Sequence, residues 1–145
     1  MAPVVWILCK DGNLGEVRGS LSRGQDVNSK DDNNRTGLMW AVMHRHNSIV
    51  RLLLEQLTVD LNAVNNGGRT ALHHAAEFVN AEAVQMLLAD PRLTSANQKD
   101  NVGETPVSLA VKRSNENELR VLAAHPSVDL DARDGEGKTL DELAR

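Results

Sequence analysis

Residues 68–76 read Gly68-Arg69-Thr70-Ala71-Leu72-His73-His74-Ala75-Ala76, and the outline of this stretch returns along the chain. In each copy a Gly or Asn stands two residues before a Thr, and an Ala follows five residues after that Thr. Successive Thr residues are 34, 35 and 34 positions apart. The four copies are Asn34-Arg35-Thr36 with Ala41, Gly68-Arg69-Thr70 with Ala75, Gly103-Glu104-Thr105 with Ala110, and Gly137-Lys138-Thr139 with Ala144. A fixed period of this length predicts a stack of similar units that bury their apolar faces against one another.

Each period has the same internal order. A polar turn that contains Gly or Asn leads into a short helix, and Thr opens this helix because its hydroxyl accepts a hydrogen bond from an unpaired backbone N–H. A short break, a second helix that ends in apolar residues and an extended piece complete the unit. The breaks fall at 45–47, 79–81 and 114–116, the second helices at 49–54, 83–88 and 119–123, and the extended pieces at 59–62 and 128–131.

The ends of the chain follow the same scheme with weaker signals. A first helix is expected over 4–10, a break at Gly12-Asn13, a second helix over 17–21 and an extended piece over 26–28. The last helix is expected over 139–144. The whole chain, 1–145, is therefore interpreted as one repeat domain. Its predicted units are an N-terminal partial repeat at 1–30, full repeats at 31–64, 65–99 and 100–133, and a C-terminal partial repeat at 134–145.

These residues resemble the ankyrin repeat, whose helix-opening motif is Thr-Pro-Leu-His-x-Ala. Residues 70–75 depart from that motif only at Ala71, and residues 105–110 keep Pro106 but place Ser108 where His is usual. The resemblance implies an all-α repeat fold, an α-solenoid of helix pairs joined by hairpin-like turns. It also implies a concave face, formed by turn tips and first helices, that binds another protein, and no catalytic centre.

Composition narrows the function further. The net charge of −4 disfavours nucleic-acid and anionic-membrane partners, since both need a basic surface. The N-terminal apolar run over 4–9 is shorter than a signal-peptide core or a membrane span. Cys9 is the single cysteine, so no internal disulfide can form. We expect a monomer in the cytoplasm or nucleus.

Candidate binding residues are those that differ between units while the frame repeats. Phe78 is the strongest candidate anchor, because aromatic side chains are enriched in binding hot spots. Two interpretations of Trp40 stay open, contact with a partner and packing between units. The candidates at the turn tips are Asp32, Asn33, Arg35, Asn66, Arg69, Asn101, Val102 and Glu104, and those on the first helices are Trp40, Met43, His44, Glu77, Phe78, Lys112 and Arg113.

Other residues that suggest chemistry have structural explanations. In the resembled family, the ring at the position of His73 bridges the backbones of adjacent turns. His46 is expected to cap the break between helices, and Cys9 to be a buried, inert thiol. Residues 135–139 look like the end of a phosphate-binding loop, but Ala132 stands where that motif needs Gly. We therefore predict no enzyme activity, metal or cofactor.

The leading hypothesis is a protein-interaction module whose partner the sequence does not name. The alternative is a regulatory or inhibitory domain of a larger protein, acting on an enzyme, channel or transcription factor. Asn62 ends a stretch that resembles segments hydroxylated on Asn in some ankyrin arrays, which leaves its modification open.

Overall fold

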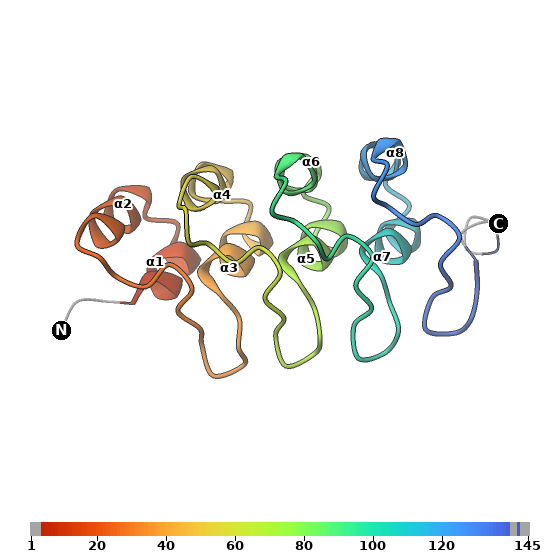
Figure 1. Ribbon diagram of the computed structural model, residues 1–145, viewed down its shortest axis with the longest axis horizontal. Helices are drawn as coiled ribbons and strands as arrows, with labels where there is room; N and C mark the ends of the chain where they lie inside the picture. The colour runs from red at the N-terminus through yellow and green to blue at the C-terminus, as the bar shows by residue number, and fades with distance from the viewer. Residues whose placement is uncertain (1–3, 140–141, 143–145) are drawn as a thin grey trace.

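The computed structural model describes residues 4–139 and 142, and its helices form a row of pairs (Figure 1). One layer holds the first helix of each pair and a second layer holds the other. The first helices are α1 (Val5–Asp11), α3 (Gly37–Met43), α5 (Ala71–Glu77) and α7 (Pro106–Arg113); the second helices are α2 (Leu14–Ser22), α4 (Asn47–Leu54), α6 (Ala81–Ala89) and α8 (Glu116–Ala124). Within the described residues there is no strand, only one isolated bridge between Lys30 and Thr36. The predicted all-α solenoid is confirmed.

The threonines begin the first helices as expected. The hydroxyls of Thr36, Thr70 and Thr105 accept from backbone N–H groups three residues on, at 3.3, 3.3 and 3.2 Å. Thr139 accepts from Glu142 N at 3.4 Å, while the rest of the helix expected over 139–144, including Ala144, lies outside the described residues. Side-chain caps therefore fix where each first helix starts.

Asparagines begin three of the four second helices in the same way. The side chains of Asn13, Asn80 and Asn115 accept from the N–H three residues on. The helices consequently start two or three residues before the predicted positions. At α4 the N-cap residue is His46, and its side chain makes no capping bond, so the capping role predicted for His46 is wrong. Its ring instead lies against Gly12, where a Cβ would stand 2.6 Å from it.

Small residues let the helices of neighbouring units approach closely. Ala41, Ala75 and Ala110 are fully buried. A Cβ on Gly37 would stand 2.9 Å from Cys9 Sγ, which shows how tightly α1 meets α3. Cys9 is itself fully buried, and burial raises the pKa of its thiol to about 12. The thiol is therefore protonated at neutral pH, as expected for an inert cysteine.

A ladder of asparagine side chains joins the loops that follow the second helices. Asn28, Asn62 and Asn97 each donate to a carbonyl of the next unit, at Thr58, Arg92 and Ser127, over 2.8, 3.0 and 2.7 Å. Each also accepts a backbone N–H from that unit, at Asp60, Thr94 and Asp129. These matching bonds define which residues are equivalent in successive units.

Candidate protein-binding face

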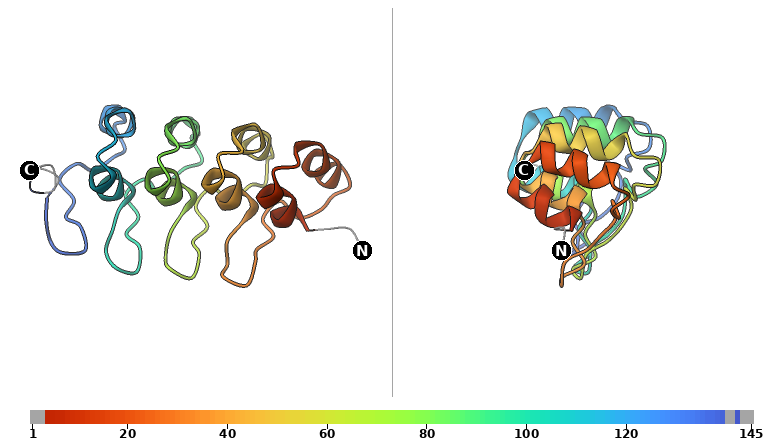
Figure 2. Two further views of the ribbon diagram at one scale, coloured as in Figure 1. Left: turned by 180° about the vertical axis from the view of Figure 1, so that it is seen from behind. Right: turned by 90° about the vertical axis from the view of Figure 1, so that its left-hand side faces the viewer.

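The turns between units are hairpins that extend away from the helices to one side, as the view along the stack shows (Figure 2). One carboxylate or amide organises each hairpin by accepting backbone N–H groups two and four residues on. Asp31, Asn65, Asp100 and Asp134 have this role, and Asp100 Oδ1 for example accepts from Val102 N at 3.0 Å and Glu104 N at 2.9 Å. Neighbouring hairpins are joined by Asn66 N to Asn33 O at 3.0 Å and Asn101 N to Gly67 O at 2.9 Å. The face that the hairpins and first helices share is therefore a rigid scaffold.

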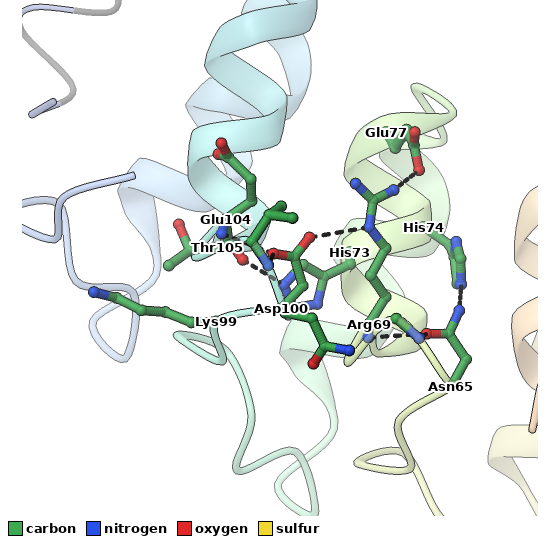
Figure 3. A network of polar contacts seen from close by, with 12 residues as sticks. Asn65, Arg69, His73, His74, Glu77, Lys99, Asp100, Glu104 and Thr105 are labelled. Carbon is green, nitrogen blue, oxygen red and sulfur yellow. Dashed lines mark hydrogen bonds and ion pairs between the residues drawn. The ribbon is translucent and has the colours of Figure 1, made fainter. Parts of the chain in front are cut away.

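Arg69, on the 65–69 hairpin, connects the 100–104 hairpin to helix α5 (Figure 3). Its Nε donates to Asp100 Oδ2 at 3.1 Å and its guanidinium pairs with Glu77, which also faces Arg113 at 3.6 Å. Burial raises the pKa of Asp100, but hydrogen bonds from the Glu104 and Val102 backbones and from Arg69 outweigh it and lower the pKa overall. Arg69 was expected at a turn tip; instead it lies on the returning limb of its hairpin and is held by these carboxylates.

His73 bridges two turns, as the resemblance implied. Its Nδ1 accepts from Thr70 N at 3.1 Å, so its Nε2 carries the hydrogen and donates to Glu104 O at 2.9 Å. Burial is the main cause that lowers the pKa of His73, which keeps the ring neutral. The structural role expected for this ring is confirmed.

Glu104 corrects a second expectation. It was expected at an exposed tip, but its side chain is buried, with Ser108 Oγ donating to it at 2.7 Å and Lys112 Nζ at 2.5 Å. The two units differ at the residue three positions after the Thr cap, which is His73 in the preceding unit and Ser108 here, whose hydroxyl bonds to the Glu104 carboxylate. The exposed tip of this hairpin is Asn101 and Val102.

Trp40 is only 9% exposed and packs chiefly within the protein. Its Nε1 donates to Asp31 Oδ2 at 3.1 Å, and its ring stacks on Trp6 and His44 at centroid distances of 6.4 and 5.5 Å. The Arg35 guanidinium lies 4.4 Å from the same ring, so Arg35 is also held back from the tip. Packing accounts for most of the Trp40 ring, and its contact with a partner stays a prediction.

The sequence did not point to Lys10, whose Nζ lies 4.8 Å from the Trp40 ring on the opening unit. Only the alignment of 4–10 with the later first helices could have indicated it. Of the named candidates, several remain exposed on this face. They are Asp32, Asn33, His44, Asn66, Phe78, Asn101, Val102, Lys112 and Arg113, with Met43 and Glu77 half-buried.

Among residues 4–139 and 142, no group of three or more metal-ligating side chains comes together. In that same part of the chain, every helix is too short or too polar to cross a bilayer.

Residues 5–95 match the family described as ankyrin repeats in three copies. The chain belongs to the ankyrin repeat family. Ankyrin repeats are a protein–protein interaction fold without enzymatic chemistry of their own.

The ankyrin repeats of this chain are similar to parts of much longer proteins. Neurogenic locus notch homolog protein 1 of Xenopus laevis is 37% identical over 78 residues, which are 54% of this chain and 3% of that protein. BTB/POZ domain-containing protein 1 of Schizosaccharomyces pombe is 37% identical over 128 residues, which are 83% of this chain and 9% of that protein. The corresponding human notch homolog is 36% identical over 78 residues.

Proposed function

We propose that this chain binds a partner protein through the face shared by its hairpins and first helices. The observation that carries the proposal is the contrast between a repeated frame and the unlike side chains that project from it. The Asp or Asn at the base of each hairpin and the Thr caps recur, whereas the tips present Asp32-Asn33, Asn66-Gly67 and Asn101-Val102. A fixed scaffold with variable tips is typical of a binding surface.

Phe78 and Val102 are the apolar anchors of this face. Phe78 is 43% exposed and Val102 is 68% exposed. The Phe78 ring lies 6.2 Å from the His74 ring, which limits its freedom in the unbound protein. An aromatic side chain that is already ordered costs little entropy on binding, and such residues dominate hot spots.

The experiment compares partner capture by the wild type and by Phe78→Ala/Val102→Ser. Both side chains are exposed and are hydrocarbons that form no hydrogen bonds, so this variant should keep its circular dichroism spectrum. Arg69 and Glu104 are unsuitable for this purpose, because both hold hairpins in place.

Partners identified by mass spectrometry after cross-linking should lose at least tenfold in affinity for the variant, about 1.4 kcal/mol. Ala123→Lys, at an exposed position of α8 on the second-helix layer, should retain these partners. Equal affinity of the wild type and Phe78→Ala/Val102→Ser for every captured partner would refute this face as the binding site. A regulatory or inhibitory role of the same domain stays a prediction that no contact in the structure favours.

A further inference from the structure

The second helices lie on the side of the stack away from the hairpins (Figure 1). Two apolar grooves lie between neighbouring helices of this layer. The first, of about 390 Å³, lies between α4 and α6 and is lined by Leu54, Met86 and Ala89. The second, of about 230 Å³, lies between α6 and α8 and is lined by Leu88, Val121 and Ala124, with Ala89 again at its wall. The two are equivalent in the repeat, because Leu54 and Leu88 are 34 residues apart and Met86 and Val121 are 35 apart.

Beside the first groove, an arginine of the chain covers the end of a helix. Arg92 donates to Leu54 O at 2.5 Å and to Gln56 O at 2.7 Å, which are carbonyls at the C-terminus of α4. The Asp90 carboxylate holds the guanidinium in place, at 3.0 Å from Nε and 2.7 Å from Nη2. A cation is favoured there because the C-terminal carbonyls form the negative end of the helix dipole.

The second groove lacks that arginine. Because Asn62 bonds to Arg92 O and Asn97 bonds to Ser127 O, Ser127 occupies the place of Arg92 in the next unit. By the same register His125 replaces Asp90. The carbonyls equivalent to those of Leu54 and Gln56 are those of Leu88 and Asp90.

Within residues 4–139 and 142, no hydrogen-bond donor reaches the Leu88 carbonyl. Pro91, the residue that begins the following turn, has no N–H to give. The Leu88 carbonyl at the end of α6 is therefore an acceptor without a donor from the described residues, and Leu88 itself lines the second apolar groove.

We propose that these grooves are a second docking surface for an amphipathic helix of a partner protein, with two apolar side chains seven residues apart and an arginine on the same face. Seven residues advance a helix by about 10.5 Å, slightly more than the separation of about 8–10 Å between packed helices that sets the spacing of the grooves. The arginine binds the Leu88 carbonyl as Arg92 binds that of Leu54. Arg51 and Glu55 both line the first groove, but Arg51 pairs with Glu82 at 3.0 Å, whereas Glu55 has no ion pair among the described residues. Glu55 and the C-termini of α6 and α8 therefore favour a basic rather than an acidic helix.

The test uses a fluorescein-labelled helical peptide of about 18 residues, with two leucines seven residues apart and one arginine between them on an alanine and lysine background. Fluorescence anisotropy measures its binding to the wild-type chain. We expect saturable binding that weakens at least tenfold when the peptide arginine becomes glutamine. A similar loss is expected when the lysines become glutamates. Equal affinity of any of these peptides with the original would overturn the proposal.

Two variants of the protein test the site itself. Ala89→Lys places a cation at the wall of both grooves and should weaken the peptide at least tenfold, whereas Ala123→Lys, at an exposed position of α8 outside both grooves, should not. His125→Asp/Ser127→Arg rebuilds the Asp90 and Arg92 pair in the next unit, so its own guanidinium should compete with the peptide arginine and abolish the difference between the arginine and glutamine peptides. Unchanged binding to Ala89→Lys, or a persistent arginine preference in the double variant, would refute the site. Phe78→Ala/Val102→Ser should bind this peptide normally, which separates failure of this surface from failure of the hairpin face.

Discussion

At the scale of single residues, Glu118 is the least expected feature of the chain. Its side chain is fully buried in α8, and neither carboxyl oxygen has a hydrogen-bond partner within the described residues. Burial raises the pKa of Glu118 from 4.5 to about 7, against the smaller lowering effect of Arg45. The equivalent positions of α4 and α6 hold Ile49 and Ala83, so a polar group here carries a cost that the preceding units avoid.

This burial predicts an unusual pH dependence. The folded chain keeps the Glu118 proton up to about pH 7, whereas the unfolded chain keeps it only up to about pH 4.5. The contribution of Glu118 protonation to the free energy of unfolding is therefore largest below pH 4.5 and is lost as the pH rises through 7. Glu118→Gln should therefore exceed the wild type in free energy of unfolding at pH 8, by at most about 3 kcal/mol, and should lose this advantage at pH 4.

Urea unfolding of both proteins from pH 4 to pH 8 measures that difference. His74 acts in the opposite sense, because burial and nearby Arg69 lower its pKa from 6.5 to about 4, so its contribution is lost as pH falls through this range. Subtracting the wild type from the variant cancels the His74 contribution. A difference that does not vary with pH would show that Glu118 is ionised in the folded chain.

Val79 lies in a left-handed backbone conformation, with φ 56°, at the break between α5 and α6. The equivalent residue of the first pair is Gly12, with φ 76°. For a β-branched residue this conformation costs about 1–2 kcal/mol. Gly avoids that steric cost, but the greater conformational entropy of Gly in the unfolded chain lowers the free energy of unfolding and offsets part of the gain. Val79→Gly should raise the free energy of unfolding by about 1 kcal/mol, measured by urea unfolding. Val79→Ala keeps Cβ and is the control; an equal gain there would assign the effect to something other than φ.

At the scale of elements, the asparagine ladder links one unit to the next. The Asn62 side chain donates to Arg92 O at 3.0 Å and accepts from Thr94 N at 2.9 Å and Ser95 Oγ at 2.6 Å. Asn62→Ala leaves these groups unpaired and should cost about 2–3 kcal/mol. Asn62→Asp keeps the acceptor and should cost less.

Exposed Asn117 on α8 supplies the control for the ladder, and Asn117→Ala should change stability by less than about 0.5 kcal/mol. Thermal unfolding followed by circular dichroism ranks the three variants. If Asn62→Ala unfolds at the same temperature as Asn117→Ala, the ladder contributes nothing to the stack. Modification of Asn62 stays a separate prediction.

The elements also show what the sequence could and could not reveal. The Thr and Ala register predicted each helix pair, because caps and small residues are local signals that recur with the period. The Thr and Ala register did not predict the side-chain contacts between units. Ser108, which stands where the preceding unit has histidine, bonds to the buried Glu104 carboxylate, and nothing beside Glu104 in the sequence marks that contact. The Arg92 bond to the end of α4 joins residues 38 positions apart, and only the fold brings them together.

At the scale of the whole molecule, a stack of this kind is held by contacts between neighbouring units alone. The ion pairs also join neighbouring units. Arg69 pairs with Asp100 of the next hairpin, and Lys112 Nζ lies 3.6 Å from Asp134 Oδ2 of the hairpin after that. A substitution in one unit should therefore change chiefly the stability of the units beside it. The stability of distant units should respond little.

Removal of residues 134–145 tests this expectation. The hairpin that begins at Asp134 packs on the preceding one so closely that a Cβ on Gly135 would stand 1.8 Å from Val102 O. Its loss uncovers the 100–104 hairpin and deprives Lys112 of the Asp134 carboxylate. We expect the melting temperature to fall by roughly 2–4 °C for each kcal/mol lost. Amide hydrogen exchange should quicken most in α7 and α8 and least in α1 and α2, because coupling decays along the stack.

Gly135→Ala, which keeps the full chain but forces the two hairpins apart, should give a weaker version of the same gradient. Uniform loss of protection from α1 to α8 would show instead that the units unfold as one cooperative block, and an unchanged melting temperature would show that the last hairpin does not cap the stack.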